Sequence, residues 1–278
     1  MPTSEKNASK MLPNQSGVAQ RPLLGRGSYF ALSMRPLHIL AFLLPVVVLY
    51  ELGTLGVFGP VRDSLEAHQM LVRFFDLFGV VGLHLPALAL VSMLLIQHVL
   101  SRDPLRFLPT VWIKMVFESA FLTVPLIVIV MLLKPVVGLG GGLGGVENAG
   151  MVIQATGGEP SQMSQVMLAL GAGLYEEMLF RLVLITMIHF LVSDVLGFSE
   201  TKGFMVGLLV SSIVFAWHHD QIYLLDGSIN FRMAFFYFIA GLYFGILFLM
   251  RGLGIAVGVH LMYDLLVLVV IPAFEKST

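Results

Sequence analysis

The sequence predicts an all-α, polytopic helical membrane protein with about seven or eight transmembrane helices. Of its 278 residues, 57% are hydrophobic and only 12% are charged, whereas soluble globular domains carry about 25% charged residues. Several apolar runs approach the roughly 20 residues that a helix needs to cross a bilayer. The chain has no cysteine, which excludes disulfides, a thiolate nucleophile and a cysteine-ligated zinc site. Its formal net charge of −1 gives no electrostatic case for a nucleic-acid partner. The long apolar runs make membrane lipids the expected surroundings.

Composition divides the chain into three parts. Residues 1–35 are mostly polar and rich in Ser, Asn, Gly and Pro, which predicts a disordered cytoplasmic tail. The late start of the first apolar stretch does not fit a cleaved signal peptide. Residues 36–160 and 163–273 are mostly apolar and are predicted to form membrane helices, and the three clusters of ionisable residues lie in the second of these parts. The segments predicted to form helices are 36–58, 78–100, 111–137, 163–192, 203–219, 232–250 and 253–273.

The connecting segments indicate how the chain is oriented in the membrane and how its helices are joined. The stretch around 60–79 would form an eighth element if it is an interfacial amphipathic helix. Lys and Arg residues are frequent in the first 35 residues and in the loop 101–114, which predicts a multi-pass protein with a cytoplasmic N-terminus. The Gly-rich segment 138–150 has no preceding strand and no following Gly-Lys-Ser/Thr. It is therefore predicted to be a flexible connection and not a phosphate-binding loop.

Three ionisable residues lie inside the fourth apolar segment, in the stretch GLYEEMLFR. Such groups are costly in a bilayer, so each is a candidate functional residue. Glu177 and Arg181 are four residues apart and share a helix face, so they can neutralise each other. Glu176 points about 100° away on an α-helix and keeps no cation of its own. Burial would suit it as a general base. The alternative is a helix-packing network without chemistry.

Two further clusters contain histidine. The fifth segment ends in Phe215-Ala216-Trp217-His218-His219. Adjacent residues point about 100° apart on a helix, so one of the two imidazoles can face a site. The alternative is simple solvation of both at the membrane interface. The last segment carries His260 and Asp264, four residues apart on one face. This pair suits metal ligation or oxyanion binding, and a single buried hydrogen-bonded pair is the alternative.

Taken together, the three clusters form a hydrolytic set on three helices. Glu176 and His219 could hold and deprotonate a water, and His260 with Asp264 could polarise a scissile carbonyl. If a metal is bound, Glu176, His219 and His260 are its candidate ligands, and zinc is the cofactor that these groups would suit. The sequence contains neither HExxH nor GxSxG, so the common zinc-protease and serine-hydrolase motifs are absent.

These three motifs resemble those of the CPBP family, the type II CAAX prenyl proteases and bacteriocin-processing membrane proteins. GLYEEMLFR is similar to the family's EExxxR motif, FAWHH to its FxxxH motif as Phe215 and His219, and HLMYD to its third motif as His260 and Asp264. The order and spacing agree, and the resemblance covers roughly residues 163–273. It implies that these residues form the family's protease core and that residues 36–160 are additional N-terminal membrane helices.

The resemblance implies an intramembrane endopeptidase, either metallo- or glutamate-type, in a bacterial or archaeal cell membrane. By position, Glu176 and His219 would activate the water, and His260 and Asp264 would bind the oxyanion. Glu177, Arg181 and Phe215 would support the site structurally. The substrate would be a membrane peptide or a lipidated, CAAX-type protein. Asp264 stands where the eukaryotic-type enzymes have Asn, and an ionised Asp only accepts hydrogen bonds. An ionised Asp264 would therefore repel an oxyanion, and would favour a bound metal or orient His260 instead.

Two other functions remain open from the sequence. The first is a non-catalytic membrane scaffold or bacteriocin-immunity protein on the same fold. The second is a proton or ion transporter in which Glu176, His219 and His260 relay protons. The intact motifs favour the protease over the scaffold. The chain shows no internal repeat, which argues against a transporter built from inverted repeats.

Overall fold

The protein is a bundle of helices. The computed structural model describes residues 27–58, 66–76, 82, 84–137, 161–224 and 227–275. Within these ranges, the only β-type pairing is one isolated bridge, between Tyr223 and Ile229. The elements are α1 (Tyr29–Ser33), α2 (Pro36–Thr54), α3 (Glu66–Asp76), α4 (Leu85–Ser101), α5 (Pro109–Val137), α7 (Gln162–Gly171), η1 (Ala172–Ile185), α8 (Thr186–His189), η2 (Phe190–Val195), α9 (Glu200–His218), η3 (Asp220–Ile222), α10 (Phe231–Leu265), η4 (Leu266–Val270) and α11 (Ile271–Glu275).

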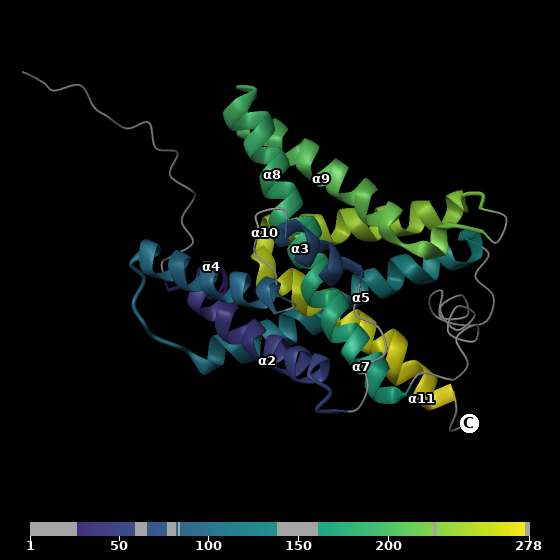
Figure 1. The fold of residues 1–278 in the computed structure, drawn as a ribbon, viewed down its shortest axis with the longest axis horizontal. Coiled ribbons are helices and arrows are strands. Elements are labelled where there is room, and N and C mark those ends of the chain that lie inside the picture. The colour runs from purple at the N-terminus through teal and green to yellow at the C-terminus, as the bar shows by residue number, and fades with distance from the viewer. Residues whose placement is uncertain are drawn as a thin grey trace, which may run out of the picture.

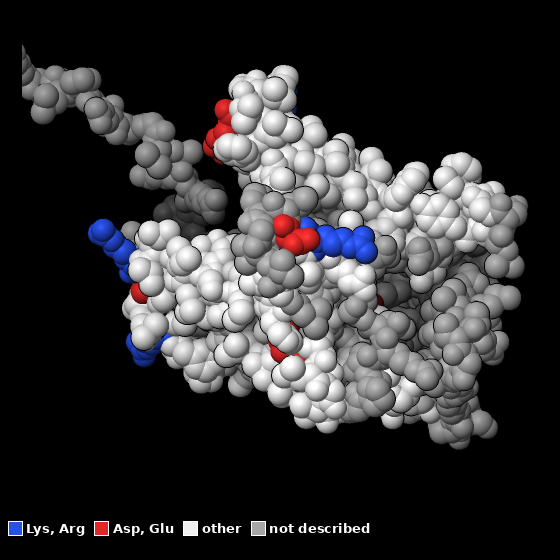
Figure 2. Space-filling view, in the orientation of Figure 1, with Lys and Arg blue, Asp and Glu red and all other residues white. Residues whose placement is uncertain are grey.

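The lengths and compositions of these helices are those of an integral membrane protein. Among the described residues, five helices are long and apolar enough to cross a membrane, and the apolar helix α4 is shorter. The face shown in Figure 2 carries few charged side chains. The prediction of an all-α, polytopic membrane protein is confirmed. The five candidate spans are Pro36–Thr54, Pro109–Leu132, Gln162–Val195, Glu200–His218 and Phe231–Phe274.

The last of these spans is broken at Gly252. The 44 residues of Phe231–Phe274 would reach about 66 Å as one straight helix, roughly twice the hydrocarbon thickness of a bilayer. Gly252 has φ 78° and ψ 176°, a conformation that glycine adopts easily and other residues do not. Figure 1 shows the chain changing direction along α10. The break falls between the predicted segments 232–250 and 253–273, so each half has the length of one span.

The predicted helix 163–192 is present, but its type differs from the expectation. Ser161 caps α7 by accepting a hydrogen bond from the backbone N–H of Ser164, and the chain then continues as the π-helix η1 over Ala172–Ile185. A π-helix bonds each residue to the fifth one along, so its turn is wider than that of an α-helix, and such turns are frequent at functional sites. The sequence of this segment contains no period that distinguishes the two helix types.

The tail prediction is corrected at its C-terminal end. Tyr29–Ser33 form α1, and Ser33 is fully buried. Arg251 on α10 donates to Ser33 Oγ at 2.9 Å and to both carboxylate oxygens of Glu118 on α5 at 2.6 and 2.8 Å. These bonds fix the polypeptide to the bundle before the first membrane span. Residues 1–26 and the Gly-rich segment 138–150 lie outside the described residues.

Helix α10 occupies the centre of the bundle and brings the chemistry-bearing helices together. It packs against α5, α9 and η1, while α2 packs against α4 and α7 (Figure 1). Glycines permit these close approaches. A Cβ on Gly241 would lie 3.0 Å from Cα of Ser212 on α9, and a Cβ on Gly258 would lie 2.4 Å from Oγ of Ser119 on α5. Small residues at helix contacts let membrane helices approach in this way.

Candidate active site

The two adjacent carboxylates on η1 have different neighbours. Glu177 Oε1 lies 3.1 Å from Arg181 Nη1, and both side chains are fully buried. The same oxygen accepts a hydrogen bond of 2.8 Å from Nδ1 of His260 on α10. The structure thus contains the ion pair expected from the spacing, and it also joins that pair to the His260 cluster, which the spacing alone does not reveal.

Aromatic rings and a backbone carbonyl surround the Arg181 guanidinium. Arg181 Nη2 donates to the carbonyl of Gly241 at 3.3 Å. Its guanidinium carbon lies 4.3 Å from the ring centroid of Phe215 and 5.4 Å from that of Phe244. A cation over an aromatic face is stabilised by the ring quadrupole, most strongly when it is shielded from water. Phe215 therefore contributes to the environment of Arg181, and through Arg181 to that of Glu177.

The backbone and one ring orient His219. It follows the last residue of α9 with φ −86° and ψ 117°, where the helix ends. Its Nδ1 lies 2.8 Å from the carbonyl of Phe215. A carbonyl only accepts, so Nδ1 is the donor and the neutral ring presents the lone pair of Nε2. The ring stacks on Tyr237 with a centroid distance of 3.9 Å.

His260 is oriented in the same way by different groups. Its Nδ1 donates to the Glu177 carboxylate, and its ring stacks on Phe244 at 4.4 Å. Its other ring nitrogen, Nε2, lies 3.4 Å from Oδ2 of Asp264, which is one helical turn further along α10. The carboxyl groups of Glu177 and Asp264 therefore lie beside this imidazole, and they would compensate a positive charge on it.

Glu176 lies where the two imidazoles converge. Its Oε2 is 4.0 Å from His219 Nε2 and 3.9 Å from His260 Nε2. The same oxygen is buried and has no hydrogen-bond partner among the described residues. Separations of this size are too long for direct hydrogen bonds and are those at which a bridging water is expected. Three predicted catalytic groups thus surround one point, with Asp264 beside it.

The arrangement does not fit a metal ion as it stands. Within the part of the chain that the structure describes, no group of three His, Cys, Asp or Glu side chains is placed to hold one. Tetrahedral ligands at about 2.0–2.1 Å from zinc would lie closer to one another than the separations around Glu176 Oε2. The residues around Glu176 are therefore assigned no metal-dependent step.

Sequence reasoning missed the two rings that stack on the imidazoles. Tyr237 and Phe244 belong to the aromatic stretch FRMAFFYFIAGLYFGILFLM, in which nothing separates packing residues from site residues. They lie seven residues apart on α10, a separation that brings two side chains to the same face of a helix. This spacing is the only signal in the sequence that could have pointed to them.

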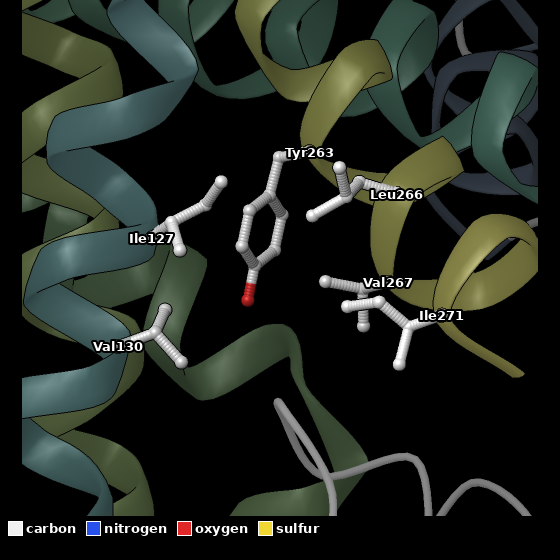
Figure 3. A pocket seen from close by; sticks show the side chains of 6 residues that line it. All are labelled: Ile127, Val130, Tyr263, Leu266, Val267 and Ile271. Atoms are coloured by element: carbon white, nitrogen blue, oxygen red, sulfur yellow. The ribbon is translucent and has the colours of Figure 1, made fainter. Parts of the chain in front are cut away.

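A small apolar pocket adjoins the third motif (Figure 3). The Tyr263 ring, next to Asp264 in sequence, lies between side chains of α5 and side chains that follow α10. The pocket has no carboxyl, imidazole or basic group, so it is distinct from the cluster around Glu176. Its lining residues are Ile127, Val130, Tyr263, Leu266, Val267 and Ile271.

Substitution of Gly173 should disturb the site through the backbone. A Cβ at Gly173 would lie 2.9 Å from the backbone N and 3.0 Å from Cα of Leu261, the residue after His260. We expect Gly173→Ala to lower the free energy of unfolding by about 1–3 kcal/mol, the usual cost of overpacking, and to lower activity, because η1 and α10 must separate. Thermal unfolding in detergent measures the first effect. Gly27→Ala, whose added methyl meets nothing within 4 Å, is the control, and equal stability of the two variants would contradict the prediction.

Comparison with known families agrees with the motif resemblance. Residues 162–266 match the family model described as "Type II CAAX prenyl endopeptidase Rce1-like". This segment contains all three clusters, from Glu176 to Asp264. No curated protein and no solved structure matches the chain. The N-terminal helices α1 to α5 lie outside the matched segment.

Proposed function

We propose that this chain, in which residues 162–266 match the Rce1-like type II CAAX prenyl endopeptidase family, is an intramembrane endopeptidase that hydrolyses a peptide bond with a water activated by Glu176 and His219. The observation that carries the proposal is the buried, unpartnered Oε2 of Glu176, which faces Nε2 of His219 and of His260 at 4.0 and 3.9 Å. A buried acceptor of this kind is costly unless it serves a ligand. A water shared with the two imidazoles satisfies it.

In the proposed reaction, the Glu176 carboxylate takes one proton from the bound water while His219 Nε2 holds the water in place. The hydroxide adds to the carbonyl carbon of the scissile bond and forms a tetrahedral intermediate. Glu176 then returns the proton to the amide nitrogen, and the C–N bond breaks. General acid–base catalysis of this type contributes about 10²–10⁴-fold to the rate.

His260 is the proposed partner of the oxyanion. This role requires a proton on Nε2 as well as on Nδ1. The resulting charge is compensated, because Glu177 Oε1 and Asp264 Oδ2 lie 2.8 and 3.4 Å from the ring nitrogens. Asp264 then acts through His260 and not on the oxyanion itself, which resolves the repulsion expected of an ionised Asp. Preorganised charge of this kind is usually the largest single contribution to such reactions.

A lipid-modified, CAAX-type peptide is the proposed substrate, on the strength of the family match. The experiment compares prenylated CAAX peptides with the same peptides lacking the prenyl group, using purified protein in proteoliposomes, with and without a chelator. We expect cleavage that is not abolished by the chelator. Chelator-sensitive cleavage restored by zinc would overturn the metal-free mechanism. A protein that cleaves no member of the panel would instead support the non-catalytic scaffold or immunity function.

His219→Gln should lower kcat by about 10²-fold, because the amide cannot present an imidazole lone pair to the water. The matched control is His218→Gln, which changes the neighbouring imidazole. His218 packs beside Phe180, with 5.3 Å between ring centroids, and should leave kcat near the wild-type value. Cleavage kinetics of the two variants decide the point, and equal losses at both positions would contradict a specific role for His219.

A further inference from the structure

Tyr175, the residue immediately before Glu176, connects the proposed catalytic helix to the N-terminal helices. Its hydroxyl donates a hydrogen bond of 2.6 Å to Oε1 of Glu51, near the end of α2. Glu51 lies outside the segment that matches the family, and its partner is 124 positions further along the chain. The other carboxylate oxygen, Oε2, pairs with Nδ1 of His84, just before α4. Glu51 therefore holds Tyr175 from one side and is itself held from the other.

Contacts with two rings hold the Tyr175 ring in place, in addition to the hydrogen bond of its hydroxyl. It stacks on the imidazole of His68 from α3, with centroids 4.4 Å apart and an interplanar angle of 4°. It also meets the ring of Tyr50 from α2 edge-on at 5.0 Å. Tyr50 and His68 are joined by a hydrogen bond of 3.1 Å between the hydroxyl and Nδ1. Tyr175 is fully buried, so α2 and α3 enclose its side chain.

Glu176 depends on its neighbours for its position. Its Oε2 has no hydrogen-bond partner among the described residues, so this oxygen is not held by a direct contact. The preceding residue, Tyr175, is held by the N-terminal helices, and the following residue, Glu177, is held by Arg181 and His260. Glu176 thus lies between two residues that are held by hydrogen bonds, while its own Oε2 lies 3.9–4.0 Å from the two imidazoles. In the wide turn of a π-helix, these flanking contacts set where its carboxylate points.

We propose that Glu51 is a positioning residue for the reaction, which fixes the direction of the Glu176 carboxylate through its hydrogen bond to Tyr175. The inference rests on the proposed function of Glu176. It makes the N-terminal helices part of the catalytic unit and not only additional membrane anchors. A misplacement of about 1 Å at a reacting group can cost about 10²-fold in rate, so losing this bond should be visible in kcat.

The test uses Tyr175→Phe, Glu51→Leu, Glu51→Gln and the double variant Tyr175→Phe with Glu51→Leu, each assayed for cleavage of a prenylated peptide in proteoliposomes. We expect Tyr175→Phe and Glu51→Leu to lower kcat by about tenfold or more, with KM unchanged. The double variant should lose no more than the single ones, because both remove the same bond. Glu51→Gln keeps a carbonyl oxygen that accepts from Tyr175, so it should retain most of the activity.

Tyr29→Phe is the matched control. The Tyr29 hydroxyl also donates to a carboxylate, that of Glu118, in the cluster around Arg251, which contains none of the proposed catalytic residues. Burial and the bond to Glu118 raise the pKa of Tyr29 above its usual value, so the phenol is the donor. Loss of this bond should lower the unfolding temperature about as much as Tyr175→Phe does, while kcat stays at the wild-type value.

Amide hydrogen exchange gives a second readout that does not depend on cleavage. Peptides covering η1 should exchange faster in Tyr175→Phe than in Tyr29→Phe. Equal kcat for Tyr175→Phe and Tyr29→Phe, multiplicative losses in the double variant, or unchanged exchange in η1 would overturn the inference. These results leave the proposed function intact, provided that wild-type protein cleaves and Glu176→Gln does not. Wild-type protein that does not cleave would defeat the proposed function and the inference together.

Discussion

Glu176→Gln should reduce peptide cleavage by about 10⁴-fold, at the upper end of the range for a general base, and leave the fold intact. Gln has the shape of Glu but cannot take a proton from water. The buried Oε2 of Glu176 has no hydrogen-bond partner among the described residues, so replacing the charge should remove little native stabilisation. The unfolding temperature should remain equal or rise, as is common when a functional charge is removed from a buried site.

The measurement combines cleavage kinetics with thermal unfolding in the same detergent. Glu200→Gln is the control, since Glu200 is an exposed residue in the first turn of α9 and should keep wild-type activity. Cleavage that survives Glu176→Gln would eliminate this carboxylate as the base. A large fall in unfolding temperature would show that Glu176 stabilises the fold. It would then contradict the assignment of catalysis to Glu176 and of structural support to Glu177.

Arg181→Ala should have the largest effect on stability, about 3–5 kcal/mol, because it breaks a buried ion pair and leaves the partner charge uncompensated. Arg181 is fully buried, lies 3.1 Å from Glu177 Oε1, and packs against Phe215 at 4.3 Å. Its removal also leaves a cavity between rings, which adds to the loss. Activity should fall as a consequence, because Glu177 also holds His260.

Denaturant or thermal unfolding in detergent measures this loss. Arg232→Ala, an exposed residue in the first turn of α10, should change stability by no more than about 0.5 kcal/mol. The double variant Arg181→Leu with Glu177→Leu should recover part of the loss, since an apolar pair leaves no buried charge. An Arg181→Ala protein as stable as Arg232→Ala would contradict the structural role.

Much of the local arrangement was predictable from spacing. Glu177 with Arg181 and His260 with Asp264 are four residues apart, and both pairs meet in the structure at 3.1 and 3.4 Å. Helix boundaries were less predictable where the sequence is uniformly apolar. The prediction did not anticipate the π-helix η1, which packs against α10, α9 and α3, because no change in residue type marks where the wider turn begins or ends. Helix α1 was missed because its anchor, Arg251, lies more than 200 residues away.

The amino-acid sequence by itself determined the class of the protein and the identity of its ionisable residues. Apolar runs of about 20 residues form helices in a bilayer, and charged residues inside such helices are rare. Only the tertiary structure decided how these residues combine. The bonds from His260 to Glu177 and from Tyr175 to Glu51 span 83 and 124 positions. Contacts over such separations depend on how the helices pack against one another, and no pattern within one helix encodes that packing.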